Sequence, residues 1–223
     1  MTGLPRTCAR AEGPDGAGPR EIAPAARGGY KRPFDLALLG LALFALAPVW
    51  ALLGLGIALA IRLDDGGPAI YRQPRLGRGG KVFEILKFRT MAVGAEDGSG
   101  PVWTAPGDAR ITRVGRVLRR FHLDELPQAG NILKGEMSLV GPRPERPELA
   151  ARIERTAPGF RARLRVRPGV AGLAQAEGAG WRDPARKLHY DNLYIAAMSP
   201  WLDLKLCARC LARALGPRRG RPR

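Results

Sequence analysis

The sequence predicts an α+β protein in which a proline-broken, re-entrant membrane helix leads into a small, mainly helical cytosolic domain. Three observations predict this class. Residues 34–61 are almost entirely apolar with Pro48 near their middle, two strand-like stretches flank a glycine-containing turn, and the remaining periodicity is helical. We therefore expect one short β-hairpin in the domain, together with amphipathic helices that lie in the membrane interface.

The apolar run at residues 34–61 is long enough to enter a bilayer, which needs roughly 20 apolar residues to cross. Its one charge, Asp35, lies at the edge. A continuous helix of this length would extend about 42 Å, more than the roughly 30 Å hydrocarbon core requires. Because Pro48 removes a backbone donor and clashes with the preceding turn, we expect the helix to break there and return to the same face. A kinked single span is the alternative.

Basic residues lie on both sides of the apolar run, whereas a simple span shows a Lys/Arg bias on one side. They are Arg27, Lys31 and Arg32 before the run and Arg62, Arg72, Arg75 and Arg78 after it. Both ends are therefore interpreted as cytoplasmic. The run is also too long for a signal peptide, and no small-residue cleavage site follows it.

The 223-residue chain is strongly basic, with 37 Lys and Arg against 20 Asp and Glu and a formal net charge of +17. Such a chain attracts an anionic partner, which charge alone leaves open among lipid headgroups, nucleic acid and a phosphorylated substrate. Its three cysteines give no disulfide framework, as suits a reducing cytosol. We interpret Cys207 and Cys210 as apolar packing residues, and Cys8 lies in a tail.

Composition divides the chain into four parts. Residues 1–29 are expected to be a disordered basic tail, residues 30–62 the membrane element, residues 63–215 the domain, and residues 216–223 a basic C-terminal tail. Within the domain, strands are expected at residues 69–73 and 82–88 around a turn at residues 77–80. Residues 91–108 are predicted to be either a mobile substrate loop or a linker.

Helical spacing and end signals predict the remaining elements. Residues 111–121 form a helix capped by Thr112, and a second helix runs over residues 124–134 and stops at Gly135. Pro147 and Pro184 each mark the first turn of a later helix, the second capped by Asp183. Residues 201–215 form an amphipathic helix with Lys205, Arg209 and Arg213 on one side and Leu204, Cys207, Leu211 and Leu215 on the other. This helix lies either in the membrane interface or on the domain core.

Two adjacent carboxylates, Asp124 and Glu125, are the sharpest candidate for chemistry. They precede a helical run with Pro127 in its first turn, where the helix dipole and free backbone N–H groups favour anions. Asp124 is therefore expected to be ionised and able to act as a nucleophile. Glu125 is expected to hold a divalent metal together with phosphate oxygens. The alternative is a purely structural role, in which Asp124 caps the helix and Glu125 interacts with the helix dipole from the first turn.

Two basic clusters are candidates for phosphate binding. Lys87 and Arg89 alternate at the end of a predicted strand and therefore share a face. This face either binds a diphosphate or is simply exposed to solvent. Arg143 lies between two prolines that hold its guanidinium rigidly, either against a phosphate or carboxylate or in an exposed turn. With only His122 and His189 in the chain, a histidine metal site is not expected.

Taken together, these clusters fall within a series of motifs that closely resembles the bacterial sugar transferases, which are monotopic polyprenyl-phosphate phosphoglycosyl transferases. The motifs are KFRTM (87–91), LDELPQ (123–128), NILKG (131–135), MSLVGPRP (137–144), RPGVAGLAQ (167–175), YDNLYI (190–195) and WLDLK (201–205). The resemblance covers about residues 30–215. Motifs of this length in this order are highly specific.

The resemblance implies a two-step exchange at the bacterial inner membrane, on its cytoplasmic face. Asp124 attacks a UDP-sugar, UMP leaves, and polyprenyl (undecaprenyl) phosphate then takes the sugar phosphate from the aspartyl enzyme. Glu125 is expected to bind Mg²⁺, and Lys87, Arg89, Arg119 and Arg143 are expected to hold phosphates, Arg89 on strand geometry alone. The reaction would be the first membrane step of exopolysaccharide, capsule, O-antigen or glycoprotein glycan assembly. Anionic inner-membrane lipids and downstream glycosyltransferases are the further expected partners, and the family's proline-broken helix favours the re-entrant topology.

The chain departs from the family pattern at the break. The family often has Ser-Pro there, where the hydroxyl satisfies a freed carbonyl, but here Ala47 precedes Pro48 and another partner is needed. Two rival functions also accompany the resemblance. A non-catalytic basic membrane adaptor would leave the ordered motifs unexplained. A membrane-tethered nucleic-acid binder fits the charge, but the basic residues are not interleaved with aromatic residues, so no nucleic-acid partner is expected.

Overall fold

The computed structural model describes residues 26–97, 100, 102, 104–105, 107–180 and 182–215. The expected tails therefore lie largely outside the described residues, as does Cys8. Residues 26–29, which were expected to belong to the N-terminal tail, form part of a 3-10 turn, η2 (Ala26–Tyr30), because this turn leads directly into the first helix.

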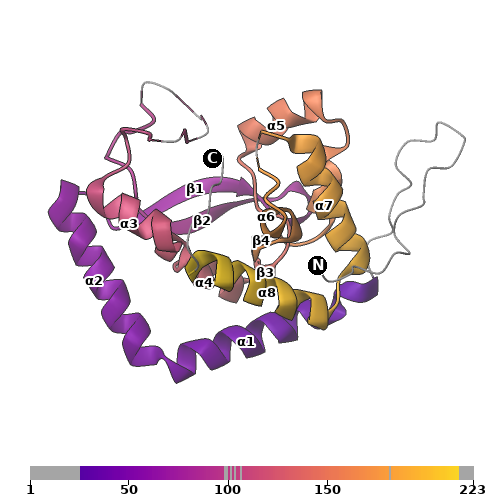
Figure 1. Cartoon of the computed structure of the whole chain (residues 1–223), viewed down its shortest axis with the longest axis horizontal. Helices are drawn as coiled ribbons and strands as arrows, with labels where there is room; N and C mark the ends of the chain where they lie inside the picture. Colours follow the sequence, from indigo (N-terminus) through magenta and orange to yellow (C-terminus); the bar gives the residue numbers. More distant parts are fainter. Residues whose placement is uncertain are drawn as a thin grey trace, which may run out of the picture.

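The apolar run forms two helices, α1 (Lys31–Ala45) and α2 (Ala47–Asp65), that meet at an angle (Figure 1). The break is at Leu46, with φ −122° and ψ 23°, and Pro48 lies in the first turn of α2. The predicted break at Pro48 is therefore shifted by two residues, because proline is tolerated in a first turn but not beyond it. The indole Nε1 of Trp50 donates to the carbonyl of Ala42 across the break (3.0 Å), and this carbonyl also accepts from Leu46 N (3.3 Å).

Both arms of the broken helix expose apolar side chains around the break. Phe44 is 86 % exposed and Leu52 71 % exposed, and the apolar surface continues along α2. By length and composition α2 could cross a membrane. Figure 1 shows that the far ends of both helices lie beside the domain, while the break points away from it.

The predicted hairpin is confirmed by strands β1 (Ile70–Leu76) and β2 (Val82–Phe88), which pair antiparallel from Ile70–Phe88 to Leu76–Val82. A 3-10 turn, η3 (Arg78–Gly80), joins them. A second, parallel pair, β3 (Ser138–Val140) with β4 (Gly169–Ala171), was not predicted. These strands are too short for a periodic signal. Two glycines allow their close approach, since a Cβ on Gly169 would lie 2.0 Å from the backbone nitrogen of Gly141.

The helices predicted for the domain are present, although some of their bounds differ. They are α3 (Arg113–Phe121), α4 (Gln128–Lys134), α5 (Pro147–Thr156), α7 (Pro184–Ala197) and α8 (Pro200–Leu215). Thr112 caps α3 by accepting from Gly115 N (2.9 Å), and Asp183 caps α7 by accepting from Arg186 N (3.0 Å). Two short segments without a clear local signal, α6 (Leu173–Ala176) and the 3-10 segment η5 (Phe160–Arg165), were not predicted.

The helix predicted at residues 124–134 starts later than expected. The two acids belong to a separate 3-10 turn, η4 (Leu123–Glu125), and α4 begins only after Pro127. Asp124 is therefore not the cap of α4. The physical reason is Pro127, whose ring fits the start of a helix and prevents α4 from extending back through the acids.

Helix α8 packs on the core through one side and exposes apolar residues on another. Leu206 is buried, and Cys207 and Cys210 pack against the same cluster, as predicted for the cysteines. The buried side is centred on Asp203 and Leu206, whereas Leu204 and Leu211 of the predicted apolar side are exposed. Contact of that side with the membrane interface stays a prediction. Tertiary contacts therefore use a different face from the one that hydrophobicity alone selects.

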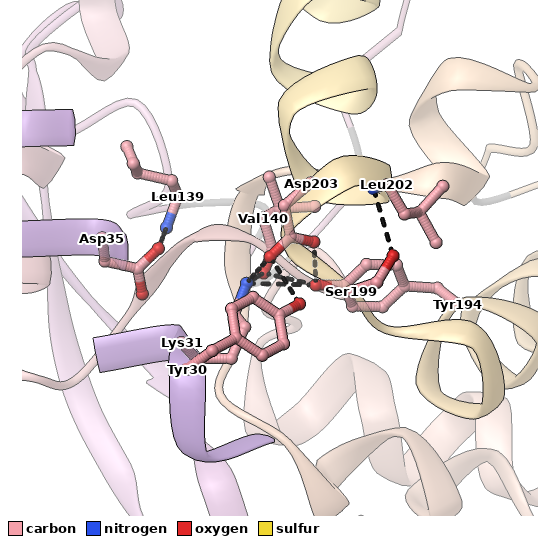
Figure 2. Close-up of polar contacts among 9 residues, drawn as sticks. All are labelled: Tyr30, Lys31, Asp35, Leu139, Val140, Tyr194, Ser199, Leu202 and Asp203. Carbon is pink, nitrogen blue, oxygen red and sulfur yellow. Dashed lines mark hydrogen bonds and ion pairs between the residues drawn. The ribbon is translucent and has the colours of Figure 1, made fainter. Parts of the chain in front are cut away.

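A group of four side chains joins α1 to α8 and is here called the anchor cluster (Figure 2). Its members are the partly buried Tyr30 and the buried Lys31, Tyr194 and Asp203. Lys31 Nζ donates to Asp203 Oδ2 (2.8 Å), to Tyr194 Oη (3.1 Å) and to the carbonyl of Val140 (2.7 Å). The hydroxyls of Tyr30 and Tyr194 donate to the two oxygens of Asp203 at 2.9 and 2.8 Å. Every donor of the Lys31 ammonium is therefore used inside the protein.

Other charged residues that flank the apolar run also bind the domain. Arg32 donates to the carbonyls of Ile132 and Leu133 at the end of α4. On the far side, Asp64 accepts from Val114 N at the start of α3 (3.0 Å). Lys31 and Arg32, which were interpreted as charges facing the cytoplasm, thus serve as docking contacts.

Replacement of Lys31 by Met is expected to lower the free energy of unfolding by roughly 3 kcal/mol, because it leaves the buried Asp203 charge unpaired. The double variant Lys31→Met/Asp203→Leu should recover part of this loss. Denaturant titration in detergent would measure both. The matched control is Arg72→Ala, which breaks the exposed pair with Glu84 (3.7 Å) and should change stability by less than about 0.5 kcal/mol. Equal losses at both sites would contradict the role of the anchor cluster.

Candidate active site

One cavity of about 680 Å³ brings together all the catalytic and phosphate-binding residues predicted from the sequence. Its walls come from the hairpin, the segment after β2, the end of α3, the turn η4 and the loop between β3 and α5. The predicted residues that line it are Lys87, Arg89, Arg119, Asp124, Glu125 and Arg143. Because these residues come from segments that are well separated in the sequence, only the tertiary fold places their side chains together.

The two acids are presented by a short turn between α3 and α4. Helix α3 ends at Phe121, and the next residue, His122, adopts a left-handed conformation (φ 56°) and reverses the chain into η4. Asp124 is 8 % exposed and lines the cavity with its neighbour Glu125. A left-handed residue other than glycine is uncommon and costs energy, so the sharp reversal depends on the surrounding packing.

Glu125 is held by two cations. Arg143 binds both of its carboxylate oxygens in a bidentate pair, and Lys87 Nζ lies 3.6 Å from Oε1. Burial alone would raise the pKa of Glu125, but the charges of Arg143 and Lys87 outweigh it and hold that pKa well below its usual range. Burial lowers the pKa of Lys87, an effect that the charge of Glu125 opposes. Glu125 is therefore ionised, and its charge is balanced before any ligand binds.

The loop that carries Arg143 is fixed by a second layer of charges that the sequence analysis missed. Arg163 Nη2 donates to the carbonyl of Arg143 (2.8 Å), and Arg75 Nη1 donates to the carbonyl of Pro144 (3.1 Å). Arg163 is itself held by the buried carboxylate of Asp191 at 2.8 Å. Asp191 belongs to one of the motifs quoted above, but its spacing from Arg143 in the sequence gave no sign that the two lie close together.

The remaining two predicted cations are Arg89, in the segment that follows β2, and Arg119 of α3, which contacts that segment. Arg119 Nε donates to Thr90 Oγ1 (2.8 Å). Burial lowers the pKa of Arg119, while the charge of Asp124 opposes that shift. Arg89 forms an ion pair with Asp65, the last residue of α2. Lys87 and Arg89 both line the cavity, as strand alternation predicted.

The loop after β2 forms one wall of the cavity. Its described residues from Met91 to Asp97 line the site, and Arg146 Nη1 donates to both oxygens of Glu96 (2.8 and 3.0 Å). This contact ties the loop to the segment that carries Arg143. Of the two interpretations offered by the sequence, a loop that contributes to the site is favoured over a linker.

The described residues contain no group of three or more His, Cys, Asp or Glu side chains that could hold a metal ion by themselves. Mg²⁺, however, commonly takes one or two carboxylates and completes its shell with water and substrate phosphates. Asp124 and Glu125 supply that number, and each oxygen of Glu125 keeps a second lone pair beside its bond to Arg143. The residues thus fit a Mg²⁺ ion that arrives with phosphate groups.

Comparison with known proteins assigns the family. The model of the family described as "Bacterial sugar transferase" matches residues 26–216, which include both helices of the broken pair and every residue that lines the cavity. The chain therefore belongs to the bacterial sugar transferase family.

Several curated proteins are similar to the chain. An undecaprenyl-phosphate glucose phosphotransferase of Komagataeibacter xylinus is 42 % identical over 193 residues, which cover 83 % of this chain and 36 % of that protein. A UDP-N-acetylgalactosamine-undecaprenyl-phosphate N-acetylgalactosaminephosphotransferase of Aeromonas hydrophila is 38 % identical, over 83 % of this chain and 43 % of that protein. A UDP-glucose:undecaprenyl-phosphate glucose-1-phosphate transferase of Caulobacter vibrioides is 42 % identical, over 83 % of this chain and 69 % of that protein. The chain thus spans less than half the length of the first two relatives.

Replacement of Glu125 by Gln is expected to destabilise the protein at neutral pH by roughly 2–3 kcal/mol, because Arg143 and Lys87 lose their counter-charge. The expected loss is below the range for fully buried pairs, since the Arg143 side chain keeps 31 % exposure. Denaturant titration at pH 7 would measure the loss.

The same substitution predicts a pH dependence. The pKa of Glu125 is lower in the folded state than in the unfolded chain, where it is about 4.3. Its ionised form therefore stabilises the fold above about pH 4.5, and this contribution declines as the pH falls below that value. The difference in stability between wild type and Glu125→Gln should be constant from about pH 7 to 5 and shrink toward about pH 3. A difference that grows on acidification would contradict the assignment.

Proposed function

We propose that the protein transfers a sugar 1-phosphate from a UDP-sugar to a polyprenyl phosphate, most simply undecaprenyl phosphate, through a covalent intermediate on Asp124. One observation carries this proposal: a single cavity joins two adjacent carboxylates to a group of cationic side chains beside the end of an apolar helix. Family membership and the names of the relatives, which specify undecaprenyl-phosphate sugar phosphotransferases, support the same reaction.

The first step forms a bond between a carboxylate oxygen of Asp124 and the sugar-linked phosphorus of the donor. The bond from that phosphorus to the bridging oxygen breaks, and UMP leaves with the electron pair. In the second step, a phosphate oxygen of the polyprenyl acceptor attacks the same phosphorus and the aspartyl bond breaks. The product is a polyprenyl-diphosphate sugar, and the Asp124 carboxylate is restored. Covalent catalysis of this kind divides one difficult displacement into two easier ones.

The cations around the acids supply the electrostatic part of catalysis. Lys87, Arg89, Arg119 and Arg143 would neutralise substrate phosphates, so that an anionic carboxylate can approach an anionic phosphorus. Mg²⁺, when bound, would add charge neutralisation at the phosphate oxygens. Glu125 would hold that ion while it orients Arg143. Because Glu125 is already balanced by two cations, the site is expected to take up the metal together with the diphosphate rather than alone.

A re-entrant arrangement of α1 and α2 on the cytoplasmic face of the inner membrane suits this reaction. Exposed apolar side chains extend from α1 through the break and along α2, whereas Lys31 at the start of α1 and Asp64 near the end of α2 both bind the domain. This distribution favours insertion of the break into one leaflet over a full span. The cavity would then lie near the headgroups, where a soluble UDP-sugar and a lipid phosphate can meet. Anionic lipids would attract the basic surface, including the exposed flank residue Arg62.

A basic membrane adaptor without activity remains the alternative function. It gives no reason for a cavity in which two adjacent acids face a group of cations, and a Mg²⁺-dependent release of UMP from a UDP-sugar would exclude it. The sugar itself follows from neither the charges nor the relatives, whose names specify both glucose and N-acetylgalactosamine. A panel of UDP-sugars assayed with undecaprenyl phosphate would identify it.

Asp124→Asn is expected to lower turnover by about a thousandfold or more without loss of the fold. The amide is nearly isosteric with the carboxylate but is not a competent nucleophile. UMP release by the purified protein in lipid vesicles would measure activity, and thermal unfolding would test the fold. Arg72→Ala, outside the cavity, is the control and should keep wild-type turnover. Activity of the Asp124→Asn variant within tenfold of wild type would overturn the nucleophile assignment.

Single cysteines introduced at Gly29 and Arg72, on either side of the broken helix, should both be cytoplasmic. In a background with the natural cysteines replaced, a membrane-impermeant thiol reagent should label neither in intact cells and both after the membrane is opened. Both positions are exposed in the structure, so lack of labelling would not result from burial. Labelling of position 29 in intact cells would show that the segment spans the membrane.

A further inference from the structure

Strand β1 presents three polar side chains to the cavity that the sequence analysis did not single out as site residues. Tyr71, Gln73 and Arg75 occupy alternate positions of the strand, so they lie on one face, and all three line the cavity. A chain of hydrogen bonds joins them. Arg75 Nη1 donates to the carbonyl of Pro144 (3.1 Å), and its Nη2 donates to Gln73 Oε1. Gln73 Nε2 in turn donates to Tyr71 Oη (3.1 Å).

This chain of hydrogen bonds has only one possible direction. A guanidinium only donates, so the oxygen of the Gln73 amide must face Arg75 and its nitrogen must face Tyr71. The Tyr71 hydroxyl is therefore the acceptor in that contact, and its own hydrogen remains. Among the described residues, this hydrogen is donated to no protein group. Because Tyr71 is 38 % exposed and lines the cavity, it can offer an O–H donor to a ligand there.

The hydroxyl of Tyr71 is an uncharged donor. Burial raises its pKa, and the negative charge of Glu96 acts in the same direction, so the hydroxyl keeps its hydrogen at neutral pH. The two charged side chains on this side of the cavity are paired with each other, since Arg146 Nη1 donates to both oxygens of Glu96 (2.8 and 3.0 Å). The surroundings of Tyr71 therefore suit an uncharged group better than a phosphate.

The part of the cavity at Tyr71 adjoins the part that holds the acids. Tyr71 lies directly opposite Lys87 in the antiparallel ladder, and opposite residues have Cβ atoms about 4.5–5.5 Å apart. Lys87 and Arg143 bind Glu125 beside the nucleophile, whereas the apolar Leu149 lines the cavity together with Tyr71. A UDP-sugar is divided in the same way, with a charged diphosphate between two uncharged ends that carry hydroxyl and carbonyl oxygens. One molecule could therefore occupy both parts.

We propose that the Tyr71 hydroxyl donates a hydrogen bond to an uncharged oxygen of the UDP-sugar, outside its diphosphate. This inference rests on the proposed function. The oxygen is a hydroxyl or carbonyl oxygen, carried either by the sugar or by the uridine. Gln73 and Arg75 are positioning residues, because they fix the direction in which the Tyr71 hydrogen points.

Tyr71→Phe removes the hydroxyl and keeps the ring. Binding of the UDP-sugar that supports turnover, and of UMP, is measured by calorimetric titration with Mg²⁺ in the Asp124→Asn background, which cannot form the covalent intermediate. We expect the Kd for the UDP-sugar to rise about fivefold, the loss of one hydrogen bond. An unchanged Kd for UMP would place the oxygen on the sugar, and an equal rise would place it on the uridine. Tyr190→Phe, which removes a hydroxyl on α7 outside the cavity, is the control and should change neither Kd.

Gln73→Glu tests the direction of the hydrogen bond. A carboxylate accepts from Arg75 and from Tyr71 alike, so both contacts of residue 73 remain, but the Tyr71 hydroxyl must now donate to it. Its hydrogen is thereby withdrawn from the ligand. We expect the Kd for the UDP-sugar to rise about as much as in Tyr71→Phe, and the double variant to show no further rise beyond about twofold. Gln73→Glu also decides the question if Tyr71→Phe does not fold.

The outcomes distinguish this inference from the function on which it rests. An unchanged Kd for the UDP-sugar in Tyr71→Phe would overturn the role of the hydroxyl. Weak binding in Tyr71→Phe with normal binding in Gln73→Glu would also overturn it, because the hydroxyl would then serve only to hold Gln73. Additive rises in the double variant would assign the effect of Gln73→Glu to its added charge and overturn it as well. Failure of the wild-type protein to release UMP from any UDP-sugar would instead overturn the proposed function itself.

Discussion

The buried ion pair between Lys31 and Asp203 is the contact on which the arrangement of the molecule depends. It joins the first residue of α1 to α8, and Tyr30, Tyr194 and the carbonyl of Val140 complete its hydrogen bonds (Figure 2). A buried pair of charges adds little net stability, because desolvation offsets the attraction, but loss of one partner is costly. The anchor cluster therefore acts mainly by fixing one geometry. It sets the direction in which the apolar helices leave the domain and hence where the cavity lies relative to a lipid surface.

The cavity is built on the same principle of balanced buried charge. Glu125 is neutralised by Arg143 and Lys87, and the loop of Arg143 is fixed in turn by Arg163 and Asp191. Each charge is positioned by another, so the phosphate-binding groups are ordered before a substrate arrives. Preorganised charges of this kind stabilise a transition state without the cost of reorganisation during the reaction. The strong positive charge of the chain is thus partly internal and structural, and only the remainder is available to lipid.

The break in the apolar helix is bridged by a hydrogen bond from a side chain. Ala47 offers no hydroxyl at the break, yet the indole of Trp50 reaches back to the carbonyl of Ala42. Backbone groups in an apolar environment need partners, because water is absent there. The indole adds a second hydrogen bond to a carbonyl that also accepts from Leu46 N, so a side chain in the first turn of the second helix links the two arms.

Local signals in the sequence determined much of this protein. The apolar run with Pro48, the hairpin, the Thr112 and Asp183 caps and the Gly135 stop all depend on residues close together in the chain, so a short window contains the physical cause. Local patterns and motifs likewise singled out six residues that line one cavity.

Only the tertiary structure decided which charges pair. Contacts between distant segments join Lys31 to Asp203, Arg89 to Asp65 and Arg163 to Arg143. The short strands β3 and β4 form by pairing with each other across a long stretch of sequence. The buried face of α8 was also set by packing. Where helices and strands pack together, the pairing of buried charges and the fit of side chains outweigh local propensity. No short window of sequence contains both partners of such a contact.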